Sequence, residues 1–279
     1  MDLAQKEMRT FDTLRWSLIV VFFIFTALLI VIFHDPELLI LDAFVVTGLI
    51  FIIVLLSSLV RYGKKNTAVF FLIIAAVSVF FENISMVTGF PFGLYHYSPV
   101  LGPLRVPLII ILEYFALGYI SWMIAQVLTG QYGRKIEGKQ VIVIPLIATF
   151  VFVMWDLTVD PIASTVHGFW VWQNPGVYFG VPLSNFFGWF LVGFIFFQIF
   201  SWYISRYDLK IPEKSAELMH KPFWSEAPAV YGFTALCMVA LIFYQDTDFT
   251  VSMALVTVFT MGFVTILAFV DIMDNPELE

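Results

Sequence analysis

The sequence predicts an all-α protein: a polytopic bundle of about eight transmembrane helices with both termini in the cytoplasm. The first observation is composition, because 61% of the 279 residues are hydrophobic and only 13% are charged, whereas a soluble domain carries roughly 25% charged residues. The second is a series of apolar runs of membrane-spanning length, and the third is the distribution of Lys and Arg around them. We expect residues 1–279 to form a single integral membrane domain.

Each predicted helix corresponds to one apolar run. A run of about 17–25 residues is long enough to cross the hydrocarbon core of a bilayer. The first run is followed by no small-residue cleavage site, so it is expected to be an anchor and not a cleaved signal. The eight runs cover approximately residues 14–33, 38–60, 67–87, 106–128, 141–158, 184–204, 228–244 and 249–270.

The basic residues predict the orientation of the bundle. Thirteen of the fourteen Lys and Arg fall on one side of the eight runs, and Arg105 alone falls on the other. By the positive-inside rule the basic side is cytoplasmic, which places the chain in the cell membrane as a multi-pass protein. The thirteen are Lys6, Arg9, Arg15, Arg61, Lys64, Lys65, Arg134, Lys135, Lys139, Arg206, Lys210, Lys214 and Lys221.

Two loops on the opposite side, 88–105 and 159–183, are rich in aromatic residues, Gly and Pro. Irregular backbone at membrane depth is tolerated only where protein or a cavity satisfies it, so we expect both loops to pack against the bundle or dip into it. The loops also resemble each other, since Tyr95-His96-Tyr97 and Trp170-Val171-Trp172 each precede a Val-Pro-Leu triplet by eleven residues. This pattern suggests that helices 3–4 and 5–6 are a duplicated hairpin; the alternative is chance similarity between aromatic loops.

Acidic residues near these loops are the candidates for chemistry. Glu82 lies near the outer end of the third run, where a carboxylate is costly and must either find a partner or stay protonated. A protonated carboxyl group is a candidate proton donor. Asp156 and Asp160 are four residues apart and share a helix face, and Asp160-Pro161 is expected to mark the end of that helix. Each acid has a structural alternative, either an interhelical hydrogen bond or a helix end that faces water.

Other polar residues on this side are weaker candidates. Asn185 is placed to orient water or a carboxyl group, or else to bond a neighbouring helix. Glu113 either lines the same cavity or pairs with Arg105, which is otherwise an interfacial anchor. His96, like His167, is a loop histidine able to shuttle protons, although most such residues do not.

Aromatic rings are concentrated in the two loops. Rings are common in the interfacial belts of membrane proteins, and that is the structural alternative here. The functional interpretation is a pocket for an unsaturated chain, in which ring faces stabilise a developing cation. The rings are Phe90, Phe92, Tyr95, Tyr97, Trp170, Trp172, Tyr178 and Phe179.

These residues carry a family resemblance over roughly residues 70–205. The stretch Glu82-Asn83, Thr88-Gly89-x-Pro91-Phe92-Gly93-x-Tyr95-x-Tyr97, Leu101-Gly102 and Val106-Pro107 resembles the carotenoid biosynthesis membrane proteins, a family that contains carotenoid hydratases. A second stretch is also similar to them: Asp156, Asp160-Pro161, Gly168-x-Trp170-x-Trp172, Tyr178-x-Gly180-Val181-Pro182-Leu183-x-Asn185 and Gly188-Trp189. The predicted helices at either end of the chain carry little of this signature.

The resemblance implies that water is added to a terminal isoprenoid double bond of a linear carotenoid, with no cofactor and no metal. In this hypothesis Glu82 or Asp156 donates the proton, a tertiary carbocation forms, and Asp160 or the other acid handles water. The implied partners are a lipophilic polyene or isoprenoid substrate, membrane lipid and other enzymes of the carotenoid pathway. No basic patch with base-stacking aromatics suggests nucleic acid.

Three other functions also fit these residues. A carotenoid end-group cyclase uses the same protonation but lets an internal alkene attack. A membrane prenyltransferase is suggested by Asp156-x-x-x-Asp160, although its diphosphate substrate requires Mg²⁺ and several basic residues, and only Arg105 lies on that side. A non-enzymatic lipid or solute transporter also suits membrane-embedded acids and parallel repeats.

Overall fold

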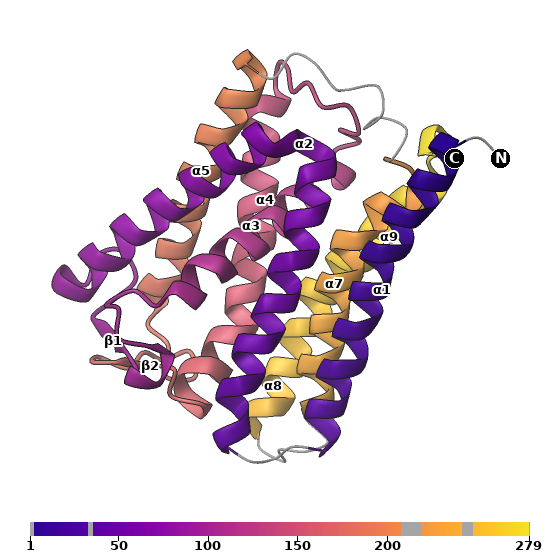
Figure 1. The fold of residues 1–279 in the computed structure, drawn as a ribbon. Helices are drawn as coiled ribbons and strands as arrows, with labels where there is room; N and C mark the ends of the chain where they lie inside the picture. Colours follow the sequence, from indigo (N-terminus) through magenta and orange to yellow (C-terminus); the bar gives the residue numbers. More distant parts are fainter. Residues whose placement is uncertain (1–2, 33–35, 208–218, 242–247, 279) are drawn as a thin grey trace.

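The computed structural model describes residues 3–32, 36–207, 219–241 and 248–278, without the side chains of residues 3–9, 30–32, 36–42 and 248. The described chain is almost entirely helical, which confirms the predicted all-α class (Figure 1). Lys210 and Lys214, and the side chains of Lys6 and Arg9, lie outside the described part of the chain.

The helices follow the predicted apolar runs. They are α1 (Leu3–Ile32), α2 (Pro36–Thr88), α3 (Leu108–Leu128), α4 (Gln140–Asp160), α5 (Leu183–Tyr207), α7 (Lys221–Ala240), α8 (Asp248–Thr257) and α9 (Phe263–Asp274). Two π-helical segments, Pro161–Val166 and Val258–Gly262, continue α4 and join α8 to α9. The short strands are β1 (Tyr95–Tyr97) and β2 (Trp170–Trp172). The α-helical pattern of α4 ends at Asp160, but the helical backbone continues as the π-helical segment to Val166, so Asp160-Pro161 does not mark the end of the helix as expected.

The length of the apolar helical segments bears on the number of membrane crossings. Within the described residues, six helical segments are long and apolar enough to cross a membrane, and one of them runs from Ala43 to Thr88. Its 46 residues would extend about 70 Å as one straight helix, more than twice the hydrocarbon thickness. Non-helical backbone at Gly63 (φ 70°, ψ 171°) breaks it between the predicted runs 38–60 and 67–87. The total of eight crossings stays a prediction.

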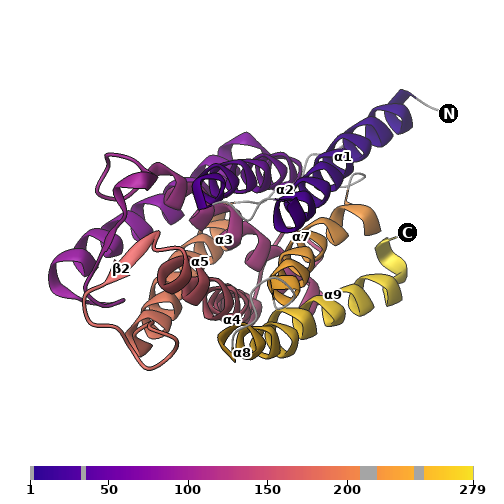
Figure 2. The same cartoon turned by 90° about the horizontal axis from the view of Figure 1, so that it is seen from below.

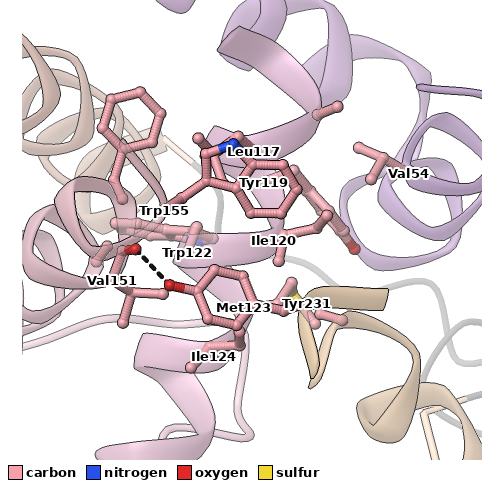
Figure 3. Packing of buried hydrophobic residues seen from close by; sticks show 14 of the residues in the cluster. Val54, Leu117, Tyr119, Ile120, Trp122, Met123, Ile124, Val151, Trp155 and Tyr231 are labelled. Atoms are coloured by element: carbon pink, nitrogen blue, oxygen red, sulfur yellow. Dashed lines mark hydrogen bonds between the residues drawn. The ribbon is translucent and has the colours of Figure 1, made fainter. Parts of the chain in front are cut away.

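Helix α3 lies at the centre of the bundle, with α2, α4, α5 and α7 around it (Figure 2). Most of its residues are buried, including the wholly enclosed Trp122. Figure 3 shows this part of α3 packed against residues of α2, α4 and α7, where the hydroxyl of Tyr231 donates a 2.8 Å hydrogen bond to the carbonyl of Val151. An apolar surface all around one helix requires neighbours on every side, which explains its central place.

The two ends of the bundle differ in character. The start of α1, the bend of α2 at Gly63 and the end of α9 lie at one end, and the pairing of β1 with β2 lies at the other (Figure 1). This arrangement agrees with the predicted separation of basic loops from aromatic loops. The side of the membrane on which each end lies stays a prediction.

Buried basic side chains are paired at the end that carries the termini. The guanidinium of Arg15 lies 2.6 Å from the carboxylate of Glu226 on α7. Arg61 donates to the side chain of Gln126 at 2.7 Å and to the carbonyls of Tyr132 and Gly133 at 3.0 and 2.9 Å. These contacts join α1 to α7 and hold the 129–138 loop against α2. They give the basic residues here a structural role.

We expect the substitution Gly188→Ala to destabilise the protein. Gly188 lies in α5 under the first aromatic loop, and an added Cβ would lie 2.6 Å from Cδ1 of Phe92 and 3.0 Å from the backbone of Pro91. Such overpacking costs about 1–3 kcal/mol, so the thermal midpoint in detergent should fall by several degrees. The control Gly48→Ala meets nothing within 4 Å and should leave the midpoint unchanged or raise it. Equal midpoints for the two variants would contradict this packing.

Candidate functional site

The two aromatic loops form one antiparallel ribbon. Strand β1 pairs with β2 in the register Tyr95 with Trp172, His96 with Val171 and Tyr97 with Trp170. Because alternate residues of a strand point to opposite faces, the four rings share one face, while His96 and Val171 are exposed on the other. Ring centroids lie 5.0 Å apart for Tyr95 and Trp172 and 6.2 Å apart for Tyr97 and Trp170. The ribbon therefore presents four rings to the helix bundle.

The carboxyl group of Glu82 is surrounded by tyrosine hydroxyls. Tyr114 of α3 donates a hydrogen bond of 2.6 Å to one oxygen, and Tyr97 of β1 donates one of 2.8 Å to the other. Tyr95 donates a third hydrogen bond to the same oxygen as Tyr97. Glu82 is only 3% exposed, so these donors replace water around it. Three donors on one carboxyl group suit an ionised acceptor.

Tyr97 lies in the loop, outside the spanning helices. Burial, followed by the neighbouring charge of Glu82, raises the pKa of the Tyr97 hydroxyl well above its usual value. The hydroxyl therefore keeps its proton at neutral pH and remains a hydrogen-bond donor. Its contact with Glu82 supplies that carboxyl group with a neutral, polarisable partner.

Asp156 and Asp160 share one amide group. The side-chain nitrogen of Asn185, near the start of α5, donates to Oδ2 of Asp156 at 2.8 Å and to Oδ2 of Asp160 at 2.6 Å. The indole N–H of Trp170 donates to Oδ1 of Asp160 at 2.8 Å. Asp156, Asp160 and Asn185 are each 2% exposed. One amide thus bridges the last turn of α4 to the first turn of α5, and the ribbon adds the third donor.

Two carboxyl groups keep free acceptors. Oδ1 of Asp156 accepts no hydrogen bond from the described residues, and neither oxygen of Glu113 does. Glu113 also makes no ion pair with Arg105, which is exposed. Both free groups line the same small cavity.

We call this cavity, of about 40 Å³, the carboxyl pocket. Ten of the twelve predicted site residues line it: Glu82, Phe92, Tyr95, Tyr97, Glu113, Asp156, Asp160, Trp170, Trp172 and Asn185. Ile110, Tyr114, Trp155, Val159 and Trp189 complete its wall. The structure therefore brings together residues that are more than one hundred positions apart in the sequence.

A second, larger cavity adjoins the carboxyl pocket. It measures about 490 Å³, and its wall is mostly apolar, with residues from α1, α2, α3, α4 and α7. That volume is typical of small-molecule sites. We call it the apolar cavity. The two cavities share five wall residues, namely Ile110, Glu113, Trp155, Val159 and Trp170.

His167 lines the apolar cavity from the end of the π-helical segment. Burial lowers the pKa of its imidazole below the usual value, so the ring is neutral at neutral pH. It contributes a polar but uncharged group to a mostly apolar wall.

Two predicted residues do not reach either cavity. His96 is exposed on the outer face of the ribbon, and Arg105 is exposed in the loop before α3. Their contact with substrate stays a prediction that the geometry does not support. The sequence reasoning in turn missed Tyr114 and Trp189, whose rings stack with centroids 5.1 Å apart. A tyrosine hydroxyl within an apolar helix was the available signal, because it needs a buried partner.

No group of three or more His, Cys, Asp or Glu in the described ranges is arranged to hold a metal ion. The two aspartates are instead bridged by the amide of Asn185.

The substitution Asn185→Leu is expected to lower the free energy of unfolding by about 2–4 kcal/mol. It removes both hydrogen bonds that the amide donates to the buried carboxyl groups. A bond to a protonated carboxyl group contributes roughly 0.5–1.5 kcal/mol and a bond to an ionised one roughly 1.5–3 kcal/mol. The measurement is thermal unfolding in detergent. Asn83→Leu is the matched control, because Asn83 donates only to the carbonyl of Val79 in its own helix. If both variants unfolded at the same temperature, the Asn185 bridge would contribute no more to stability than the hydrogen bond of Asn83 within its own helix.

Comparisons with known proteins identify the family of this chain. A bisanhydrobacterioruberin hydratase from Haloarcula japonica is 30% identical to the chain over 132 residues, which is 46% of this chain and 43% of that relative. The chain thus aligns with less than half the length of the relative. No solved structure matches the chain. A family model described as carotenoid biosynthesis protein matches residues 41–268. Because that match covers most of the sequence, the chain belongs to the carotenoid biosynthesis protein family.

Proposed function

We propose that this protein is a carotenoid hydratase, which adds water to a terminal isoprenoid double bond of a linear carotenoid. The observation that carries the proposal is the junction of the two cavities, where an apolar cavity meets a pocket that contains four carboxyl groups. The name of the relative from Haloarcula japonica supports the same reaction class. On this view the apolar cavity receives the end of the polyene and holds its terminal double bond at the wall that the two cavities share.

In the proposed reaction, Asp156 is the proton donor. Asn185 occupies Oδ2 of Asp156, so Oδ1 is the oxygen that can carry a proton toward the substrate. That proton goes to the less substituted alkene carbon, and the π electrons form the new C–H bond. The other carbon becomes a tertiary carbocation. Water then forms the C–O bond, and the proton it releases returns to the Asp156–Asp160 pair, which restores the catalyst.

The surrounding groups stabilise the cation. Glu82 contributes negative charge held in place by three tyrosines, and electrostatic interactions are stronger where water is excluded. The rings of Trp155, Trp170 and Trp189 line the pocket, and indole faces attract cations. In this scheme Glu82 is an electrostatic partner and not the acid.

An end-group cyclase is the second candidate, because it needs the same acid and the same rings. Its product is an isomer of the substrate, whereas hydration adds the mass of one water. The prenyltransferase alternative has less support, since Arg105, the basic residue expected near a diphosphate, lies outside the pocket.

We also propose that the protein lies in the cell membrane with the basic end of the bundle on the cytoplasmic side.

The substitution Asp156→Asn should reduce alcohol formation by about 10²–10⁴-fold, which is the usual contribution of a general acid. An amide keeps the shape of the side chain but cannot transfer a proton to carbon. The measurement is mass analysis of pigments extracted from a host that makes linear carotenoids. Asp274→Asn, at an exposed position near the end of α9, should behave as wild type. If Asp156→Asn formed as much alcohol as the wild-type protein, another residue would be the acid. If the wild-type protein instead formed a cyclic carotenoid of unchanged mass, the cyclase function would be favoured.

The apolar cavity is tested by the substitution Ala116→Phe. Ala116 lies in the middle of α3, is 3% exposed and lines this cavity. A phenyl group there would occupy space that the polyene needs, so we expect hydration to fall by about tenfold or more. Ala76→Phe places the same ring at an exposed position of α2 and should have no effect. Full activity of Ala116→Phe at equal protein levels would mean that the chain binds elsewhere.

A further inference from the structure

The carboxyl pocket is small compared with the substrate. Its volume is about 40 Å³, whereas a water molecule occupies about 30 Å³ in the liquid. The pocket also contains the buried polar groups, while the wall of the adjoining cavity is mostly apolar. Its size and lining therefore suit water, and the five shared wall residues mark where an alkene in the apolar cavity would meet that water.

One buried donor in this pocket makes no hydrogen bond of good geometry with the described residues. Trp172 is 7% exposed, and its indole N–H has no acceptor that meets the distance and angle of a hydrogen bond. The neighbouring indole of Trp170 differs, because its N–H is bonded to Asp160. Trp172 lines the pocket, and the same Asp160 carboxyl group is close enough to interact weakly with its N–H. A buried donor that is poorly satisfied is costly, so this N–H would be stabilised by a better-placed acceptor inside the pocket.

The pocket also offers matching acceptors. Oδ1 of Asp156 and both oxygens of Glu113 accept no hydrogen bond within the described ranges, and both residues line this pocket. A water molecule has two lone pairs and two O–H groups. It can therefore accept from the indole, donate to a carboxyl group, and keep one lone pair for attack.

We propose that the carboxyl pocket binds the nucleophilic water, and that the indole N–H of Trp172 positions that water for attack on the carbocation. This inference rests on the proposed hydratase function and adds a binding site for its second substrate. The N–H occupies one lone pair of the water oxygen, and a pocket carboxylate accepts one O–H. The second lone pair then forms the C–O bond, and the carboxylate takes the released proton.

A general loss of structure would slow alkene protonation and cation capture together, whereas loss of the positioned water would slow only cation capture. Protonation of the alkene needs the acid, whereas capture of the cation needs the positioned water. A cation that is not captured loses a proton and returns to alkene. In D₂O this return leaves deuterium in the unhydrated carotenoid.

The test uses membranes that contain the full-length protein, a linear carotenoid with an unhydrated end, and D₂O. We expect Trp172→Phe to lower hydration by about tenfold, the effect of one neutral hydrogen bond, while deuterium exchange continues. The ratio of exchange to hydration should therefore rise by about tenfold. Trp202→Phe, at a position of α5 that is 52% exposed, is the matched control and should keep the wild-type ratio. An unchanged ratio in folded Trp172→Phe would overturn the proposal.

A second variant keeps the test valid if Trp172→Phe does not accumulate. Val159→Ile adds one methylene group at the shared wall without altering Trp172, and it should displace water and raise the same ratio. A wild-type ratio in Val159→Ile would likewise overturn the water site. If the wild-type protein gave no alcohol at all, the proposed function itself would fail, which is a separate outcome from either ratio.

Discussion

The buried carboxyl groups impose the constraint on which the rest of this structure depends. Within a membrane helix bundle no bulk water is available, so each acid must find donors inside the protein. Glu82 finds three tyrosine hydroxyls, and the aspartate pair finds one amide and one indole. Several of these donors lie in loops and not in helices. The loops must therefore fold back over the bundle.

The ribbon of β1 and β2 satisfies this requirement. Its register places the first residue of one aromatic triplet opposite the last residue of the other, as in any antiparallel pair. The duplicated hairpin suggested by the sequence stays a prediction. It also explains the aromatic-x-aromatic pattern, because only alternate residues face the bundle. The middle residues, His96 and Val171, are exposed and free to differ.

The two adjoining cavities divide the chemistry between them. An apolar wall holds a hydrocarbon chain but gives no way to activate water, and a pocket of carboxyl groups activates water but has no room for the chain. In the proposed reaction, a hydrocarbon substrate meets a proton and a nucleophile at the wall that the two cavities share. Glu113 lies on the shared wall and accepts no hydrogen bond from the part of the chain that the structure describes.

The sequence by itself determined the helical class, most helix positions and ten of the residues that line the carboxyl pocket, because apolar run length and the cost of buried charge are local properties. It did not indicate that the two predicted spans 38–60 and 67–87 would meet at a sharp kink at Gly63 with no loop between them. Nor did it show that Tyr97 donates a hydrogen bond to Glu82 while His96 is exposed. It also did not show that Tyr114 donates to the same carboxyl group. Those outcomes depend on which side chains the packed helices and the paired loops bring together. Only the tertiary structure decides such contacts, since hydrogen bonds between residues far apart in sequence leave no local pattern.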